Sequence, residues 1–134
     1  MKKQQETFYF FEINDPTGFK AAMQSYIPKI TSVATLLSPP SEQPLAFVNV
    51  AFSHTGLTTL GILDDLLDLQ FAGGQFADAP NLGDDLSQWE EPFLGSNIHG
   101  VFLIGSDQVC QTLSLCRPST ALTLLKGSVH DAIR

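Results

Sequence analysis

Residues 46–62 read AFVNVAFSHTGLTTLGI and residues 98–107 read IHGVFLIGSD, and these two stretches decide the fold. Each contains an apolar run rich in β-branched and aromatic side chains, over residues 45–52 and 98–104, which is typical of a strand. The first run leads into a short helix, and a long acidic connection then joins it to the second run. The pattern predicts two strands of one sheet.

The chain before these stretches predicts a further strand and a helix. Residues 7–13, TFYFFEI, are dominated by aromatic and β-branched side chains and predict the first strand. Asp15 followed by Pro16 is a typical helix start, and apolar residues then recur with the 3.6-residue period of a helix as far as Leu37. Pro28 lies inside this helix, so we expect the helix to kink or split there.

The remaining segments complete the order of elements. Ser53 or Thr55 is expected to cap the short helix, and residues 64–97 are expected to form a long acidic loop because Gly and Pro interrupt them repeatedly. Residues 108–116 predict a second helix and residues 121–129 a fourth strand. The order βαββαβ predicts a single α+β domain of all 134 residues. It is of the ferredoxin-like type, with a four-stranded antiparallel sheet and helices on one face.

The charge of the chain is negative and unevenly spread. The 134 residues carry a formal net charge of −7, and no Lys or Arg lies between Lys29 and Arg117. Such a field repels phosphate backbones and anionic lipid, so we expect neither a nucleic acid nor a membrane as partner. No apolar run approaches the ~20 residues that span a bilayer, and the N-terminus lacks the apolar core of a secretory signal. We therefore expect a cytoplasmic protein, with Cys110 and Cys116 as free thiols.

Both faces of the expected sheet are apolar. Successive strand residues point to opposite faces, so the residues of each strand divide into two sets. We assign the wholly apolar set to the face that the helices cover: Tyr9, Phe11, Ile13, Val48, Val50, Phe52, Phe102 and Ile104. The second face combines apolar residues with three polar ones: Phe8, Phe10, Phe47, Val101 and Leu103, with Glu12, Asn49 and His99.

The second face needs a cover, because soluble monomers rarely expose an apolar patch larger than roughly a few hundred Å². Two covers are open. The long connection brings four aromatic residues that can fold across the sheet: Phe71, Phe76, Trp89 and Phe93. Alternatively, the face meets the same face of a second copy in a symmetric dimer.

Three stretches, VNVAFSHTGL, FADAPNLGDDLSQW and HGVFLIGSD, resemble the first half of a fungal dye-decolourising (DyP-type) haem peroxidase. The resemblance covers residues 7–107. It implies a ferredoxin-like half whose sheet packs on another, as in the dimeric α+β barrels, and it therefore favours the homodimer. The family's catalytic signature is GxxDG, whose Asp is the distal acid–base residue, and a His of the second half ligates the haem iron. The sequence contains no GxxDG, so no catalytic residue is carried over, and we interpret the chain as a truncated peroxidase half.

We therefore expect a non-enzymatic protein that binds a small aromatic ligand, such as a pigment or another organic chromophore, in a cavity at the homodimer interface. Aromatic rings offer stacking surfaces, and polar residues hold the edge of the ligand. The expected ligand-binding residues are Phe8, Phe10, Glu12, Phe47, Asn49, His99, Val101 and Lys126. Lys126 can form a Schiff base when it is desolvated, although a lysine at a sheet edge more commonly extends into solvent.

Haem and metal ions are not expected. Only His99 of the three histidines is assigned to the second face, and no Lys or Arg is placed to meet haem propionates. The acidic clusters lack the spacing of a calcium-binding loop, and the two cysteines lack the spacing of a zinc motif. Two alternatives stay open. One is an N-terminal fragment of a haem peroxidase that oxidises dyes and phenols with H₂O₂, and the other is an interaction module without a ligand.

Overall fold

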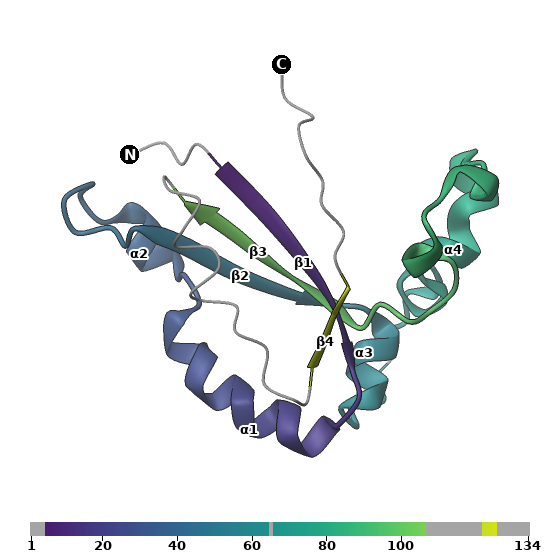
Figure 1. Ribbon diagram of the computed structural model, residues 1–134, viewed down its shortest axis with the longest axis horizontal. Coiled ribbons are helices and arrows are strands. Elements are labelled where there is room, and N and C mark those ends of the chain that lie inside the picture. Colours follow the sequence, from purple (N-terminus) through teal and green to yellow (C-terminus); the bar gives the residue numbers. More distant parts are fainter. Residues whose placement is uncertain (1–4, 65, 107–121, 126–134) are drawn as a thin grey trace.

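A computed structural model of the 134-residue chain describes residues 5–64, 66–106 and 122–125. Its elements follow in the order β1 (Gln5–Ile13), α1 (Pro16–Tyr26), η1 (Ile27–Lys29), α2 (Val33–Leu37), β2 (Ala46–Phe52), α3 (His54–Thr59), α4 (Leu69–Leu82), η2 (Leu86–Gln88), η3 (Glu91–Phe93), β3 (Gly100–Ser106) and β4 (Leu122–Leu125). Helix α1 lies across one face of the sheet, while α3 and α4 lie together at one end of it (Figure 1).

The strands form one antiparallel sheet in the order β2-β3-β1-β4 (Figure 1). The predicted α+β class and the antiparallel pairing are thereby confirmed. Strand β3 begins two residues later than expected, at Gly100, and β4 is described over four residues, which pair with the C-terminal part of β1. The second helix expected over residues 108–116 lies outside the described residues.

The first helix is split, as Pro28 predicts. The carboxylate of Asp15 accepts a hydrogen bond from the backbone N–H of Thr17 at 3.0 Å and caps α1. The helix gives way to η1, which contains Pro28, and Ser32 then caps α2 by accepting from the N–H of Thr35 at 3.1 Å. The break follows from the missing N–H of proline and the clash of its ring with the preceding turn.

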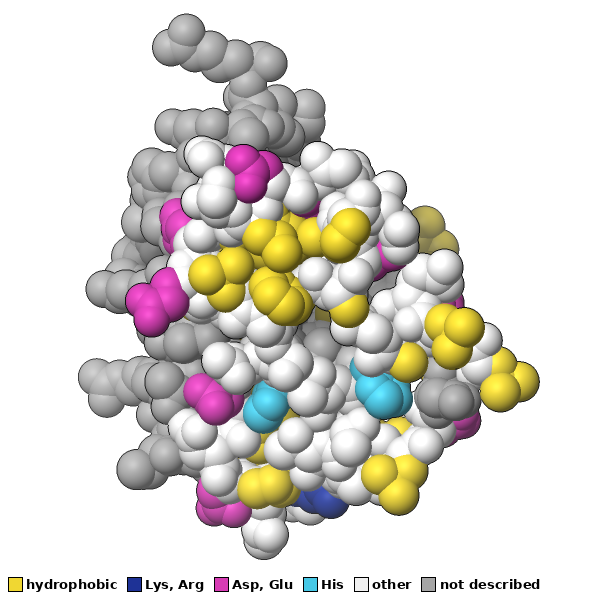
Figure 2. All heavy atoms as spheres, turned by 90° about the vertical axis from the view of Figure 1, so that its right-hand side faces the viewer, with side chains coloured by type: hydrophobic (Ala, Val, Ile, Leu, Met, Phe, Trp, Pro, Cys, Tyr) yellow, Lys and Arg dark blue, Asp and Glu magenta, His cyan; other side chains and the backbone are white. Residues whose placement is uncertain are grey.

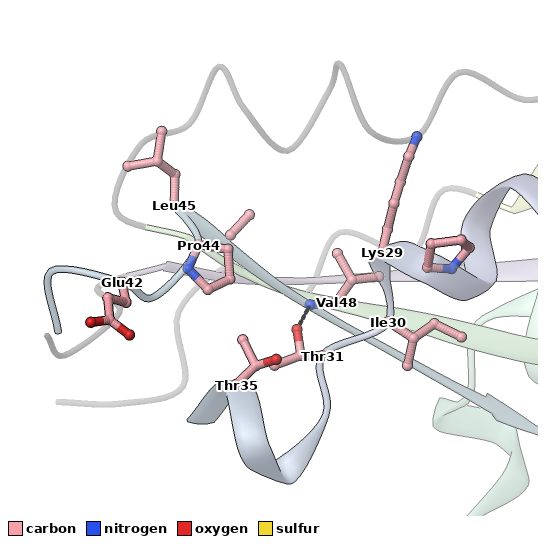
Figure 3. Close-up of a pocket in the computed structure, with 10 residues that line it drawn as sticks. Lys29, Ile30, Thr31, Thr35, Glu42, Pro44, Leu45 and Val48 are labelled. Atoms are coloured by element: carbon pink, nitrogen blue, oxygen red, sulfur yellow. Dashed lines mark hydrogen bonds between the residues drawn. The ribbon is translucent and has the colours of Figure 1, made fainter. Parts of the chain in front are cut away.

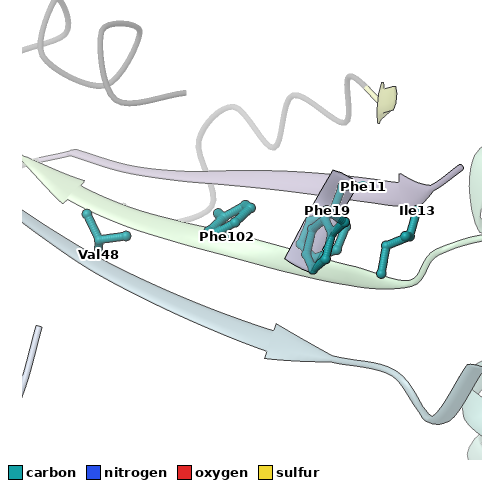
Figure 4. Packing of buried hydrophobic residues seen from close by; sticks show 5 residues of the cluster. All are labelled: Phe11, Ile13, Phe19, Val48 and Phe102. Carbon is teal, nitrogen blue, oxygen red and sulfur yellow. The ribbon is translucent and has the colours of Figure 1, made fainter. Parts of the chain in front are cut away.

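The hydrophobic core lies between α1 and the sheet face that the sequence assigned to the helices. Its central residues are Phe11, Ile13, Phe19, Val48 and Phe102 (Figure 4). The ring of Phe11 is fully buried, with its centroid 5.5 Å from that of Phe19 and 5.1 Å from that of Phe102. The assignment of this face is confirmed, because period-2 alternation sorts side chains by face whatever the strand neighbours are.

The expectation of an irregular loop over residues 64–97 is wrong in its first part. Helix α4 occupies fourteen of these residues, capped by Asp68, whose carboxylate accepts from the N–H of Phe71 at 2.9 Å. Gly74 takes the non-helical angles φ 72° and ψ 169°, so α4 consists of two helical pieces that meet at a kink. Gly83 ends α4 in the left-handed conformation, with φ 77°.

Candidate functional site

The second face of the sheet carries most of the residues that the sequence proposed for a ligand. The strand register places Phe8 beside Leu103 and Leu103 beside Asn49. In the next row, Phe10 lies beside Val101. Since directly paired residues project from the same face, the pairing brings these aromatic and aliphatic side chains together as one surface.

This surface is partly covered. The apolar side chains on it are half-buried, whereas Asn49 and Ala51 on the outer strand β2 are exposed. The ring of Phe93, in η3, meets the ring of Phe10 edge to face, with centroids 5.0 Å apart and planes at 83°. The long connection therefore covers the end of the face around Phe10.

The other three aromatic residues of the connection have ring partners away from the sheet. Phe71 packs on His54 at a centroid distance of 5.8 Å, and Phe76 packs on Trp89 at 6.3 Å. Both pairs belong to the α3–α4 end of the molecule. Among the described ring pairs, the cover that the connection gives to the second face thus rests on Phe93.

His99 is placed as a structural tie between strands. It lies one residue before β3, and its Nδ1 accepts a hydrogen bond from the backbone N–H of Ile13 at 2.9 Å. Its own backbone N–H donates to the carbonyl oxygen of Phe11 at 2.9 Å. With Nδ1 acting as acceptor, the ring proton of a neutral imidazole lies on Nε2. The Nδ1 lone pair is therefore already in use and is not open to a ligand.

The segment around His99 is held from the other side by α3. The backbone N–H of Ser53 donates to the carbonyl oxygen of His99 at 3.1 Å, and the Ser53 hydroxyl donates to that of Ile98 at 2.8 Å. A Cβ atom added to Gly56 would collide with the His99 carbonyl. The sequence predicted Ser53 or Thr55 as the helix cap, and Ser53 is the cap, but no local pattern indicated that the same residue anchors the segment before β3.

The other two polar candidates have different positions. Glu12 is half-buried on β1 and pairs in register with Thr123 of β4. Lys126 lies outside the described residues, so the Schiff-base hypothesis stays a prediction.

The described residues do not fit a haem or a metal ion. They contain two imidazoles: His99, whose Nδ1 is engaged, and His54, whose ring packs on Phe71. The described cations are Lys20 and Lys29, both in the α1–η1 region, and the Nζ of Lys29 lies 5.0 Å from the centroid of the Tyr26 ring. Within the described ranges no group of three His, Cys, Asp or Glu side chains could hold a metal, and no helix is long and apolar enough to cross a membrane.

A pocket of about 600 Å³ lies at the outer edge of β2, beneath η1 and the start of α2 (Figure 3). Thr31 closes part of that edge, because its hydroxyl accepts from the N–H of Val48 and its own N–H donates to the Val48 carbonyl, both at 2.8 Å. Lys29 and Glu42 lie on its rim and point away from each other (Figure 3). These bonds protect an edge strand from pairing with other chains, and the pocket gathers no reactive set.

Comparison with known proteins identifies the family to which this architecture belongs. The model of the DyP dimeric alpha+beta barrel domain matches residues 1–131. A dye-decolorizing peroxidase of Mycena epipterygia is 46% identical over 108 residues, which is 80% of this chain and 20% of that protein. The dye-decolorizing peroxidase msp1 of Mycetinis scorodonius is 39% identical over 139 aligned residues, which is 100% of this chain and 26% of that protein.

Solved structures agree with the sequence relatives. A dye-decolorizing peroxidase in complex with 2,6-dimethoxyphenol is 55% identical, with a TM-score of 0.85 over 98% of this chain and 32% of that one. A decolorizing peroxidase from Auricularia auricula-judae is 41% identical, with a TM-score of 0.84 over 92% of this chain and 29% of that one. The chain thus spans about a fifth to a third of the length of these relatives.

These relatives confirm the resemblance to the first half of a fungal dye-decolourising peroxidase and correct one interpretation. The absence of GxxDG led us to expect a protein that is not an enzyme, yet the relatives are named as peroxidases. The absence of GxxDG from the matched residues is therefore no evidence that the chain lies outside an enzyme family. The chain belongs to the dye-decolourising peroxidase family, through its DyP dimeric alpha+beta barrel domain.

Proposed function

We propose that the chain forms one ferredoxin-like half of a haem peroxidase that oxidises dyes and phenols with H₂O₂. The observation that carries the proposal is the close likeness in fold and sequence to a dye-decolorizing peroxidase bound to 2,6-dimethoxyphenol, at a TM-score of 0.85 and 55% identity. The interpretation as a pigment carrier has no counterpart among these relatives, which are all named as peroxidases, so we do not carry it forward.

The part that this half plays follows from its second sheet face. The face joins Phe8, Phe10, Val101 and Leu103 into one half-buried apolar surface, and among the ring pairs of the described residues Phe93 covers one end of it. Packing it against a second sheet removes the remaining apolar area from water, at about 25 cal/mol for each Å². We propose that this second sheet completes a dimeric α+β barrel, supplied by a second copy of the chain or by the matching half of the same peroxidase.

We assign the haem to the side of the partner sheet. The described residues of this half provide neither an axial ligand for the haem iron nor a cation placed to meet the propionates. This half then contributes rigidity and the exclusion of water. Its β1 and β3 strands are tied at one end by His99, so the apolar face is held in a fixed shape when it meets the other sheet.

A hybrid peroxidase tests the proposal. In the peroxidase of Auricularia auricula-judae, the aligned segment is replaced by this chain, and the hybrid is assayed for its Soret absorption and for H₂O₂-dependent oxidation of 2,6-dimethoxyphenol. We expect haem to be retained and the phenol to be oxidised. A hybrid with Leu103→Glu should lose both, while the matched control Gln24→Glu, on the exposed side of α1, should lose neither. A folded hybrid that takes up no haem, although the parent enzyme does, contradicts the proposal.

A further inference from the structure

The corner where β1 ends beside residues 98–99 is closed by an acceptor that can take up a proton. The backbone N–H of Ile13 donates to Nδ1 of His99 at 2.9 Å, whereas the bonds of a strand ladder ordinarily run to backbone carbonyls. A carbonyl oxygen accepts a hydrogen bond at any ordinary pH, but an imidazole nitrogen accepts only while it carries no proton. The closure of this corner therefore depends on the charge state of one side chain.

Protonation of His99 leaves the N–H of Ile13 without an acceptor. An imidazolium is a donor at both nitrogens, so the Nδ1 proton and the N–H of Ile13 would point at each other. Turning the ring over brings a carbon atom to the same place and supplies no acceptor either. Ile13 is 4% exposed, so its N–H has little access to water while the corner stays closed. Acid therefore favours an open corner.

The backbone of His99 is held in place from the side of α3. The N–H of Ser53 donates to the carbonyl oxygen of His99 at 3.1 Å, and the Ser53 hydroxyl donates to that of Ile98 at 2.8 Å. The His99 carbonyl also lies so close to Gly56 that a Cβ atom there would not fit. None of these contacts involves the imidazole. Residues 98–99 therefore stay on α3 when the ring is protonated, and β1 is the strand that is released.

Protons reach the ring of His99 from solvent. The residue is half-buried, and Figure 2 shows imidazole side chains at the surface on the side that carries α3 and α4. Imidazoles in proteins change their charge between about pH 5 and pH 8. The corner should respond to acid in this range.

Other ionisable groups lie on the elements around the corner. Closest in sequence on the β1–α1 side are Glu12 and Asp15, and on α3 the group is His54. Strand β3 and the described part of β4 carry no ionisable side chain. The hydrogen bond from Ile13 ends on His99, but a test has to separate the titration of His99 from that of these three neighbours.

We infer that His99 is a pH-sensitive latch between the end of β1 and residues 98–99, closed while its imidazole is neutral and open once Nδ1 is protonated. The closed corner holds no proton on Nδ1, whereas the open corner can bind one, so a falling pH shifts the equilibrium toward the open form. The backbone ladder from Gln5 to Phe11 stays paired with β3, so the opening is confined to one end of the sheet. The latch is a property of this chain and does not depend on the proposed peroxidase role.

Amide hydrogen exchange of the full 134-residue chain tests the latch, because the exchange of the donor reports on the bond itself. The protection of the Ile13 N–H, corrected for the intrinsic exchange rate, should fall at least ~10-fold from about pH 8 to about pH 5. The matched control is the N–H of Val48, which also donates to a side chain, the Thr31 hydroxyl, at 2.8 Å. That hydroxyl does not titrate in this range, so the protection of Val48 should stay constant.

The variant His99→Asn separates the imidazole from its ionisable neighbours. Its Oδ1 atom can accept from the Ile13 N–H at every pH, so the protection of Ile13 should become independent of pH. An equal fall in His99→Asn and in the parent chain would assign the effect to Glu12, Asp15 or His54 and overturn the latch. A constant protection of Ile13 in the parent chain would overturn it as well.

A second measurement needs no variant and decides the matter if His99→Asn does not fold. The ring nitrogens of His99 are titrated by NMR in the parent chain, and the loss of Ile13 protection should have the same midpoint. Midpoints more than about one pH unit apart would show that another group opens the corner.

Discussion

The imidazole of His99 and the backbone of Ile13, 86 positions apart in the chain, are joined by a hydrogen bond of 2.9 Å from the Ile13 N–H to Nδ1. The bond joins the end of β1 to the residue that immediately precedes β3. This side-chain hydrogen bond extends the β1–β3 ladder by one step, because the N–H of Ile13 donates to the imidazole in place of a backbone carbonyl. The stability of this corner therefore depends on a side-chain acceptor at position 99.

Replacing this acceptor should weaken the fold. His99→Phe keeps an aromatic ring of similar size but leaves the N–H of Ile13 without its partner, and we expect the free energy of unfolding to fall by about 1–3 kcal/mol. In His99→Asn, the Oδ1 atom can take the place of Nδ1, so most of the loss should be recovered. Urea denaturation of both variants measures the difference. Equal destabilisation by Phe and Asn would show that ring packing, and not the hydrogen bond, is what matters.

A second prediction concerns the glycine that faces the same residue. In Gly56→Ala the new methyl group would collide with the His99 carbonyl, which is backbone and cannot turn away. We expect a loss of about 1–3 kcal/mol in the free energy of unfolding, because α3 must move away from β3. The control is Gly73→Ala in α4, where the nearest atom is the Cβ of Ala77 at 3.6 Å. That substitution should be neutral or stabilise by up to about 1 kcal/mol, since Ala favours the helix.

The sheet was largely predictable because its signal is local. Alternation along each strand sorted the buried Phe11 and Phe102 from Phe10 and Val101 on the opposite face, and this needs no knowledge of which strands pair. The helix break at Pro28 was predictable for the same reason, since the cause lies within one residue. Helix α4 was missed because Gly73, Gly74 and Pro80 count as helix breakers one by one, whereas a single kink accommodates the glycines.

The candidate site was predictable only in part. The aromatic face could be assembled from strand periodicity, but the use of His99 as a tie to Ile13 is a long-range contact that no local pattern encodes. The docking of Phe93 on Phe10 was one of four open choices among the aromatic residues of the connection. The functional interpretation erred for another reason, because the motif that defines the family's chemistry is not found in the matched stretch, so its absence said nothing about the enzyme.

The third prediction tests the cover over the second face. Phe93→Ala removes the edge-to-face contact with Phe10 and uncovers that end of the sheet. Because both rings are half-buried, we expect a loss of about 2 kcal/mol in the free energy of unfolding. The NMR signals of the Phe10 ring should shift at the same time, as they lose the ring current of Phe93. Phe76→Ala, whose partner Trp89 is remote from the sheet, is the control and should leave the Phe10 signals in place.

The fourth prediction concerns pH. The Ser87 hydroxyl and, next, the Ser87 backbone N–H, which lies 2.9 Å from the carboxylate, lower the pKa of Asp85. A lowered pKa in the folded state means that the carboxylate stabilises the fold above its unfolded pKa, and that this contribution is lost as the pH falls through the folded value. Ser87→Ala removes the hydroxyl but keeps the N–H, so the pKa of Asp85 should rise part of the way. Carboxyl NMR titration measures it, with Ser25→Ala as the control, and an unchanged Asp85 titration in Ser87→Ala would contradict the assigned cause.

The last prediction concerns the second sheet face in the chain by itself. Val101 lies on this face in the row between Phe10 of β1 and Ala51 of β2, and sheet-to-sheet packing in a symmetric dimer would bury both copies of it in the interface. Val101→Lys therefore places two like charges in an apolar interface, and sedimentation velocity should show a dimer for the parent chain and a monomer for the variant. Thr58→Lys, on the exposed side of α3, adds the same charge outside the face and should leave the dimer intact. A parent chain that sediments as a monomer would contradict the symmetric dimer.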